Sequence, residues 1–149
     1  MTWQTRMPQF QRAMPVLDCT DMSRSIAFYR EKLGFSASVW GAPPSFAILQ
    51  RGTVTLALAL AAFGEAAVSD NWAAYVYVAD ADALYDELKK LGVDISEPPT
   101  DQPYNCRDFV VEDPDGHMLS FGQVLLADPL GPGLSERLGR DGSDGGDDE

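Results

Sequence analysis

The chain has 149 residues, of which 45% are hydrophobic and 23% charged, a composition typical of a globular domain with a hydrophobic core. Its formal net charge of −12 repels nucleic acid and anionic membrane surfaces, so we expect neither as a partner. The apolar runs are too short to cross a membrane, the N-terminus lacks the pattern of a secretory signal, and two cysteines are too few for a disulfide framework. These features together predict a soluble, cytoplasmic protein.

The first half of the chain predicts one strand, one helix and then three more strands. Residues 14–19 have strand character, and Asp21 is a favourable N-cap for the helix that follows. Gly34 is typical of a helix C-terminus. The apolar residues that recur on one face of this helix are Ile26, Tyr29 and Leu33. Strands are then expected over residues 35–40, 46–50 and 53–60.

The second half repeats this order. Residues 72–78 alternate as a strand, Asp80 or Asp82 caps a second helix, and Gly92 ends it. The apolar face of this helix is formed by Leu84, Leu88 and Leu91. Short strands are expected over residues 93–95, 106–111 and 117–124, with an Asp-Pro-Asp-Gly turn before the last of them.

The helices of the two halves align with each other, which indicates an internal duplication. Ser25–Phe35 and Ala83–Val93 both end in Leu-Gly followed by an apolar residue, and they lie 58 residues apart. We therefore expect an α+β domain of tandem βαβββ repeats that form a curved mixed sheet with a concave cleft for a small molecule. The expected divisions are an N-terminal arm (1–11), the domain (12–126, with repeats at 12–63 and 70–126) and a disordered acidic tail rich in Gly and Asp (127–149).

Other residue types that could carry chemistry have ordinary structural interpretations. His117, the only histidine, lies at the Asp115-Gly116-His117 corner, where we expect it to face solvent. Cys106 and His117 on neighbouring antiparallel strands could act as a thiolate and its base, but no third orienting residue or oxyanion motif accompanies them. The acidic residues that could form paired carboxylates are better explained as helix caps and turn residues: Asp18 with Asp21, and Asp113 with Asp115.

The repeat and its motifs resemble the vicinal oxygen chelate superfamily, which includes glyoxalases, extradiol dioxygenases, fosfomycin resistance enzymes and bleomycin resistance proteins. The resemblance rests on Ser-Ile-Ala-Phe-Tyr-Arg-Glu-Lys-Leu-Gly-Phe in the first half and Asp-Pro-Asp-Gly-His-Met-Leu-Ser-Phe in the second. Metal-dependent members hold a divalent ion with His, Gln or Glu at four places. Those places correspond here to Met14, Thr55, Ala73 and Ser120, so we expect no metal cofactor and no catalytic residues.

Within the superfamily the chain is most similar to bleomycin resistance proteins. The matching segments are Ala13–Leu17, Val54–Leu56, Val68–Asn71, Tyr75–Val78 and Gln102–Phe109. The resemblance implies a homodimer that sequesters a drug without catalysis and exchanges an N-terminal strand about a proline, here Pro15. It also implies that the flat rings of the drug stack between two aromatic side chains, here Phe46 and Tyr104.

Further ligand contacts are expected around this stacking pair. Asp70 matches an acidic position of the family and is expected to pair with a cationic ligand group, while Trp40 and Tyr75 are expected to form cleft walls. The chain departs from the family where Tyr104 replaces a tryptophan and where Pro43-Pro44 replaces acidic residues. Two alternatives stay open: a metal-dependent glyoxalase- or dioxygenase-like enzyme, and a metal-free enzyme that uses the same cleft.

Overall fold

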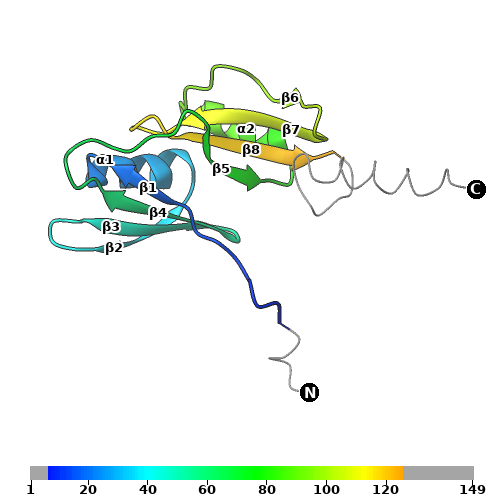
Figure 1. Cartoon of the computed structure of the whole chain (residues 1–149). Helices are drawn as coiled ribbons and strands as arrows, with labels where there is room; N and C mark the ends of the chain where they lie inside the picture. The colour runs from blue at the N-terminus through cyan, green and yellow to red at the C-terminus, as the bar shows by residue number, and fades with distance from the viewer. Residues whose placement is uncertain (1–6, 126–149) are drawn as a thin grey trace, which may run out of the picture.

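The computed structural model describes residues 7–125, and the expected tail at 127–149 and the start of the arm lie outside this range. The described chain forms two modules, each with one helical segment and one four-stranded mixed sheet (Figure 1). This arrangement confirms the predicted α+β fold of tandem βαβββ-type repeats. No helix in residues 7–125 is long and apolar enough to cross a membrane.

The first module contains β1 (Val16–Cys19), α1 (Met22–Ala27), the π-helical turn η2 (Phe28–Lys32), β2 (Ser36–Trp40), β3 (Phe46–Arg51) and β4 (Val54–Leu60). Its sheet has the strand order β1-β4-β3-β2, in which β1 runs parallel to β4 and the other pairs are antiparallel. Asp21 caps α1 as predicted, because its carboxylate accepts a hydrogen bond from the Arg24 amide.

The second module contains β5 (Trp72–Tyr77), α2 (Ala81–Lys90), β6 (Thr100–Asp101), β7 (Cys106–Glu112) and β8 (Met118–Val124), with the strand order β5-β8-β7-β6. Of the two predicted caps, Asp80 is the one that accepts from the α2 backbone, at the Ala83 amide. Gly34 and Gly92 follow the two helical segments with φ of 75° and 83°, the left-handed conformation that glycine adopts without strain.

One predicted strand is wrong. Residues 93–95 form no strand; instead Val93 and Ile95 are 6% and 5% exposed and pack into the core, and the edge strand β6 lies further along at Thr100–Asp101. The alternation of apolar residues predicted a strand. Here the apolar residues alternate because Val93 and Ile95 are buried in the core, although this segment pairs with no other strand. The first strand is also shorter than predicted, since β1 begins at Val16.

Side chains from each module fasten it to the other at two junctions. At the first, Arg51 of β3 makes two hydrogen bonds of 2.9 and 3.0 Å with the Glu87 carboxylate of α2 and donates another to the Leu33 carbonyl. At the second, the buried Tyr29 hydroxyl donates to the Asp113 carboxylate at 2.8 Å. The modules are therefore fixed to each other by polar contacts in addition to the shared core.

Candidate functional site

Four aromatic side chains lie together on the second module, and we call them the aromatic wall: Trp72, Tyr75, Tyr77 and Tyr104. The first three belong to β5, and the fourth lies in the turn before β7. Ring centroids are 4.9 Å apart for Trp72 and Tyr75, 5.2 Å for Tyr75 and Tyr77, and 6.2 Å for Trp72 and Tyr104. These spacings are typical of packed aromatic side chains.

A buried carboxylate, Asp108 of β7, accepts hydrogen bonds from two of the three phenols of this wall. Its Oδ2 atom accepts from the Tyr104 hydroxyl at 2.6 Å and from the Tyr75 hydroxyl at 3.0 Å. Tyr75 reaches Asp108 by crossing β8 at Gly122, where an added Cβ would overlap the phenol. Both tyrosines are therefore fixed by a carboxylate two strands away from β5, and Gly122 leaves the space for this contact.

Burial shifts the titration of these phenols. Burial raises the pKa of Tyr75 above its usual range, with further contributions from Cys106 and from Asp108. Burial and the hydrogen bond to Asp108 likewise raise the pKa of Tyr104. Both hydroxyls thus keep their protons at neutral pH and act as hydrogen-bond donors to the carboxylate.

A smaller aromatic pair lies on the first module. Trp40 and Phe46 are partners across β2 and β3, with ring centroids 6.0 Å apart, and Trp40 is 50% exposed. Ala47 and Leu49, the alternate residues of β3, are fully buried in the core beside α1. Side chains alternate along a strand, so Phe46 lies on the face of the sheet turned away from α1.

The aromatic wall lies on the corresponding face of the second module. Phe109 and Phe121 pack on the α2 side, so Asp108 and Gly122, their neighbours along β7 and β8, are on the face turned away from the helix. Within the described residues, no aromatic contact joins the Trp40–Phe46 pair to the aromatic wall. The two aromatic groups are therefore separate within one chain.

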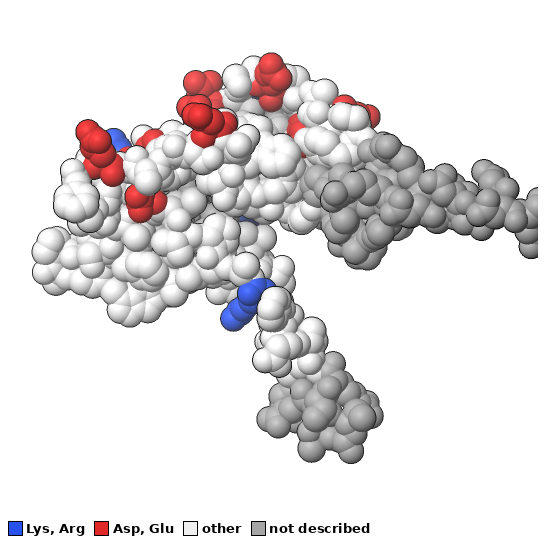
Figure 2. Space-filling model, viewed as in Figure 1, with Lys and Arg blue, Asp and Glu red and all other residues white. Residues whose placement is uncertain are grey.

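The remaining predicted ligand residue, Asp70, lies exposed in the loop that precedes β5, two residues before Trp72. It thus precedes the strand that carries three of the four residues of the aromatic wall. Figure 2 shows acidic residues on the upper part of one face of the molecule, while the surface below them, over the first sheet, carries almost no charge.

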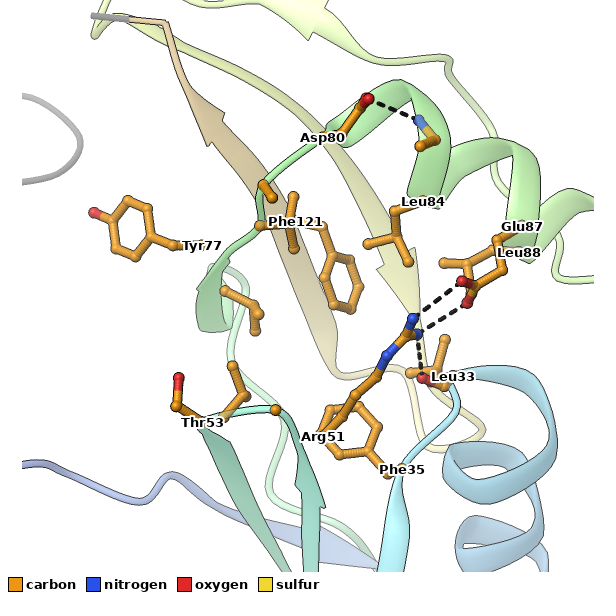
Figure 3. A pocket seen from close by; sticks show the side chains of 16 residues that line it. Leu33, Phe35, Arg51, Thr53, Tyr77, Asp80, Leu84, Glu87, Leu88 and Phe121 are labelled. Carbon is orange, nitrogen blue, oxygen red and sulfur yellow. Dashed lines mark hydrogen bonds and ion pairs between the residues drawn. The ribbon is translucent and has the colours of Figure 1, made fainter. Parts of the chain in front are cut away.

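A pocket of about 500 Å³ lies elsewhere, at the first junction between the modules. Figure 3 shows Phe35, Phe121 and Leu84 directed into it, with the Arg51–Glu87 ion pair at one side and Tyr77 pointing away. Its lining includes none of the five predicted ligand residues. The charges in it are already engaged, because Arg51 and Glu87 bind each other and Asp80 caps α2.

The four places that correspond to the family's metal ligands do not fit a metal ion. Ala73 has no donor atom, Met14 offers only a thioether, and Thr55 and Ser120 offer neutral hydroxyls. Ser120 is fully buried, and its hydroxyl has no hydrogen-bond partner. Within residues 7–125, no group of three or more His, Cys, Asp or Glu side chains could hold a metal ion.

The expectation that His117 faces solvent is wrong. The side chain is only 3% exposed, and its Nε2 atom lies 2.6 Å from the Asp18 carbonyl, which fixes the tautomer because a carbonyl can only accept. Cys106 pairs with Val124 at the opposite end of the β7–β8 hairpin, roughly 20 Å from His117 along the strands. The thiol and the imidazole therefore cannot act as nucleophile and base.

The acidic residues considered as paired carboxylates have structural roles, as expected. Asp113 accepts from the amides of Asp115 and His117 and so closes the turn between β7 and β8. Asp115 in turn accepts from Thr20 and Arg24 of the first module. Asp18 accepts from the Ala67 amide, while Asp21 caps α1.

Residue patterns in the sequence missed four members of the site: Trp72, Tyr77, Asp108 and Gly122. A usable signal was present at Asp108, since a charged residue within the apolar run Phe109–Val111 and its flanks must face a polar partner if the strand is buried. Its partner Tyr75 is not predictable from the sequence, because the two residues come together only through the parallel pairing of β5 with β8.

Comparisons with known proteins agree with this architecture. Residues 13–121 match the family described as Glyoxalase/Bleomycin resistance protein/Dioxygenase superfamily. Bleomycin resistance proteins of Geobacillus stearothermophilus and Staphylococcus aureus are each 30% identical over 132 residues, covering 76% of this chain and 97% of the relative.

Solved structures show the same similarity. The bleomycin-binding protein from the bleomycin producer Streptomyces verticillus, complexed with copper(II)-bleomycin, is 26% identical, with a TM-score of 0.63 over 77% of this chain and 97% of that one. A second bleomycin-binding protein complexed with bleomycin is 25% identical, with a TM-score of 0.61 over 76% of this chain and 98% of that one.

Proposed function

The chain belongs to the Glyoxalase/Bleomycin resistance protein/Dioxygenase superfamily, and on that premise we propose that it is a non-catalytic binding protein. It sequesters a flat, cationic antibiotic of the bleomycin type in clefts formed between two copies of the chain. We place it in the cytoplasm, where its two buried, free cysteines stay reduced.

The observation that carries the proposal is the distribution of aromatic residues. Phe46 and Trp40 of the first module and the aromatic wall of the second both lie on sheet faces turned away from the helices, yet they do not meet within one chain. In a homodimer, the first module of one copy faces the second module of the other. Phe46 and the wall around Tyr104 then form the two sides of one cleft, and each dimer has two such clefts.

The chemistry of these two aromatic groups suits a flat cation. Offset stacking on aromatic rings stabilises a bound ring by about 0.5–1.5 kcal/mol per pair beyond the area that it buries. The net charge of −12 raises the local concentration of a cationic molecule near the protein. Asp70, exposed in the loop before β5, is available to pair with a cationic group of the ligand.

Calorimetric titration with metal-free and copper-loaded bleomycin, at low and high salt, tests the proposal. We expect saturation near one drug per chain, with weaker binding at high salt because added ions screen the attraction between exposed charges. Absence of binding at tens of micromolar protein would exclude bleomycin as the ligand and contradict the proposal.

Phe46→Ala tests the stacking role. The loss of one ring face is expected to weaken bleomycin binding roughly five- to tenfold, with little change in Tm. Phe63→Ala is the matched control, because Phe63 is 95% exposed and lies in the loop after β4. If the Tm of Phe46→Ala falls as much as its affinity, Phe46 is a core residue rather than a ligand contact.

A further inference from the structure

Asp108 carries a charge that no basic side chain neutralises in the part of the chain that the structure describes. The residue is 5% exposed. Its Oδ2 atom accepts from the hydroxyls of Tyr75 and Tyr104, and its Oδ1 atom accepts from the Gln102 amide nitrogen at 3.0 Å. All three donors are neutral, so they fill three of the roughly four acceptor positions of the carboxylate without bringing a positive charge to it.

The nearest basic residue in the sequence does not supply the missing charge. Arg107 alternates to the other face of β7, where its guanidinium binds Asp82 and Asp101 at 3.0 Å each. The ion pairs formed by residues 7–125 do not include Asp108. Buried carboxylates are normally paired with a cation, because removing an isolated charge from water is costly.

The surroundings of Asp108 are suited to a cation from outside the chain. Tyr75 and Tyr104 are hydrogen-bonded to the carboxylate through their hydroxyls, and the Trp72 ring packs against both of their rings. Trp72 and Tyr77 are 43% and 48% exposed, so ring surface of the wall is accessible. Aromatic faces attract cations through their quadrupole, and a phenol that donates to a carboxylate has a more electron-rich ring.

We propose that the aromatic wall is an organic-cation site in which the charge of Asp108, acting through Tyr75 and Tyr104, selects a cation over a neutral molecule of the same shape. This inference rests on the proposed function, since it assigns a charge preference to one side of the same cleft. The ligand is a protonated or alkylated ring nitrogen or ammonium group rather than a metal ion. Three donors already occupy the carboxylate oxygens, and a ligand at the wall meets mainly rings. Asp108 is therefore a positioning residue for the phenols and the source of the selectivity.

A matched pair of probes separates charge from shape. N-methylacridinium is a permanent cation, and acridine is its neutral counterpart of nearly the same outline at mildly alkaline pH. We expect the unmodified protein to bind N-methylacridinium at least about tenfold more tightly than acridine, as measured by fluorescence titration. Equal affinity for the two probes, or binding of neither, would overturn the proposal without any variant.

Asp108→Asn keeps the side-chain size and an acceptor oxygen for the phenols but removes the charge. It should lose about tenfold in affinity for N-methylacridinium and keep its affinity for acridine within about twofold. A merely structural role would instead weaken both probes equally. Asp101→Asn is the matched control: it removes the same formal charge from the neighbouring strand, where the side chain is 64% exposed, and should leave the preference unchanged.

Trp72→Leu provides a second variant. It removes ring surface without touching the carboxylate, so both probes should bind more weakly while the ratio of their affinities stays constant. A ratio that falls to one would place the selectivity in Trp72 and contradict the role of Asp108.

A failure of this inference is distinguishable from a failure of the proposed function. Loss of bleomycin binding with retained preference for the cation refutes only the proposed drug, whereas bleomycin binding without that preference refutes only this inference.

Discussion

At the scale of single residues, Gly122 is the position at which the site depends on an absent side chain. A Cβ at this position would overlap the Tyr75 phenol, whose hydroxyl, ring carbon and neighbouring carbon atom are the three nearest atoms. The phenol cannot move without leaving Asp108, so Gly122→Ala should cost about 1–3 kcal/mol of unfolding free energy by overpacking. Urea unfolding measures this cost.

A double-variant cycle checks the cause. If overlap with the phenol is responsible, Gly122→Ala should be much less damaging in a Tyr75→Ala background, where the ring is absent. An equal cost in both backgrounds would assign the effect to the β8 backbone instead.

Tyrosine titration gives a second prediction at this scale. Burial, followed by the nearby Asp113 carboxylate, raises the pKa of Tyr29 above its usual range. In the unfolded chain a tyrosine loses its proton near pH 10, so above that value the unfolded state binds fewer protons than the folded state. Unfolding free energy should therefore fall as pH rises beyond about 10, and Tyr29→Phe should make this fall less steep. Unfolding curves in urea at increasing alkaline pH measure both slopes, and identical slopes would contradict the assignment.

At this scale the sequence predicted local chemistry better than contacts. The caps Asp21 and Asp80 were predictable because capping involves residues within one turn of each other. The burial of His117 was not predictable, because its partner is the Asp18 carbonyl, 99 residues away in the sequence. The hydrogen bond from Tyr104 to Asp108 was also outside the prediction, which treated Tyr104 as a free stacking ring.

At the scale of elements, the two module junctions place equivalent helices against equivalent hairpins with different chemistry. Tyr29 and Glu87 occupy corresponding helix positions in the two repeats, 58 residues apart. Tyr29 is fully buried and binds the buried Asp113, whereas Glu87 binds Arg51 in an ion pair whose side chains are 44% and 39% exposed. The open pocket lies at the junction that has the ion pair.

This difference predicts unequal costs for matched substitutions. Tyr29→Phe leaves a buried carboxylate oxygen without its donor and should cost about 1–3 kcal/mol. Glu87→Gln breaks an exposed ion pair and should cost about 1 kcal/mol or less, since solvent screens it. Thermal and urea unfolding of both variants measure the difference, and equal costs would show that the ion pair contributes more than its exposure indicates.

The element order itself was largely predictable from the sequence, because each module is covered by one helix and has a regular apolar pattern. The exception was the segment at 93–95, where Val93 and Ile95 are buried as apolar side chains without strand pairing. Periodicity reports which side chains face the core, and it does not report whether the backbone has a partner strand. The edge strand β6 has only two residues, too few to produce a pattern of its own.

At the scale of the whole molecule, the proposed cleft requires two copies, and the arm before β1 is the segment that we expect to be exchanged about Pro15. The Pro15 carbonyl accepts from the Ala57 amide of its own chain, so any exchanged segment precedes this residue. Figure 1 shows the described part of the arm leading away from the sheet, and Phe10 on it is 94% exposed. Met7 and Met14 on the same segment are exposed as well, and several exposed large apolar side chains on one segment are expected where another chain covers the surface.

Sedimentation of the full chain and of a chain that begins at Met14 tests this assembly. The full chain should sediment at twice its mass of 16.2 kDa, and the shortened chain should dissociate at concentrations at least about tenfold higher, because it lacks the arm contacts.

The salt dependence of the dimer is a second criterion. Each copy has a net charge of −12, so screening should strengthen the dimer while it weakens the binding of a cationic drug. Opposite salt dependences would show that assembly and ligand binding are electrostatically separate steps. A full chain that remains monomeric while it binds the drug would contradict the shared cleft, because Phe46 and Tyr104 could then not contact the same molecule.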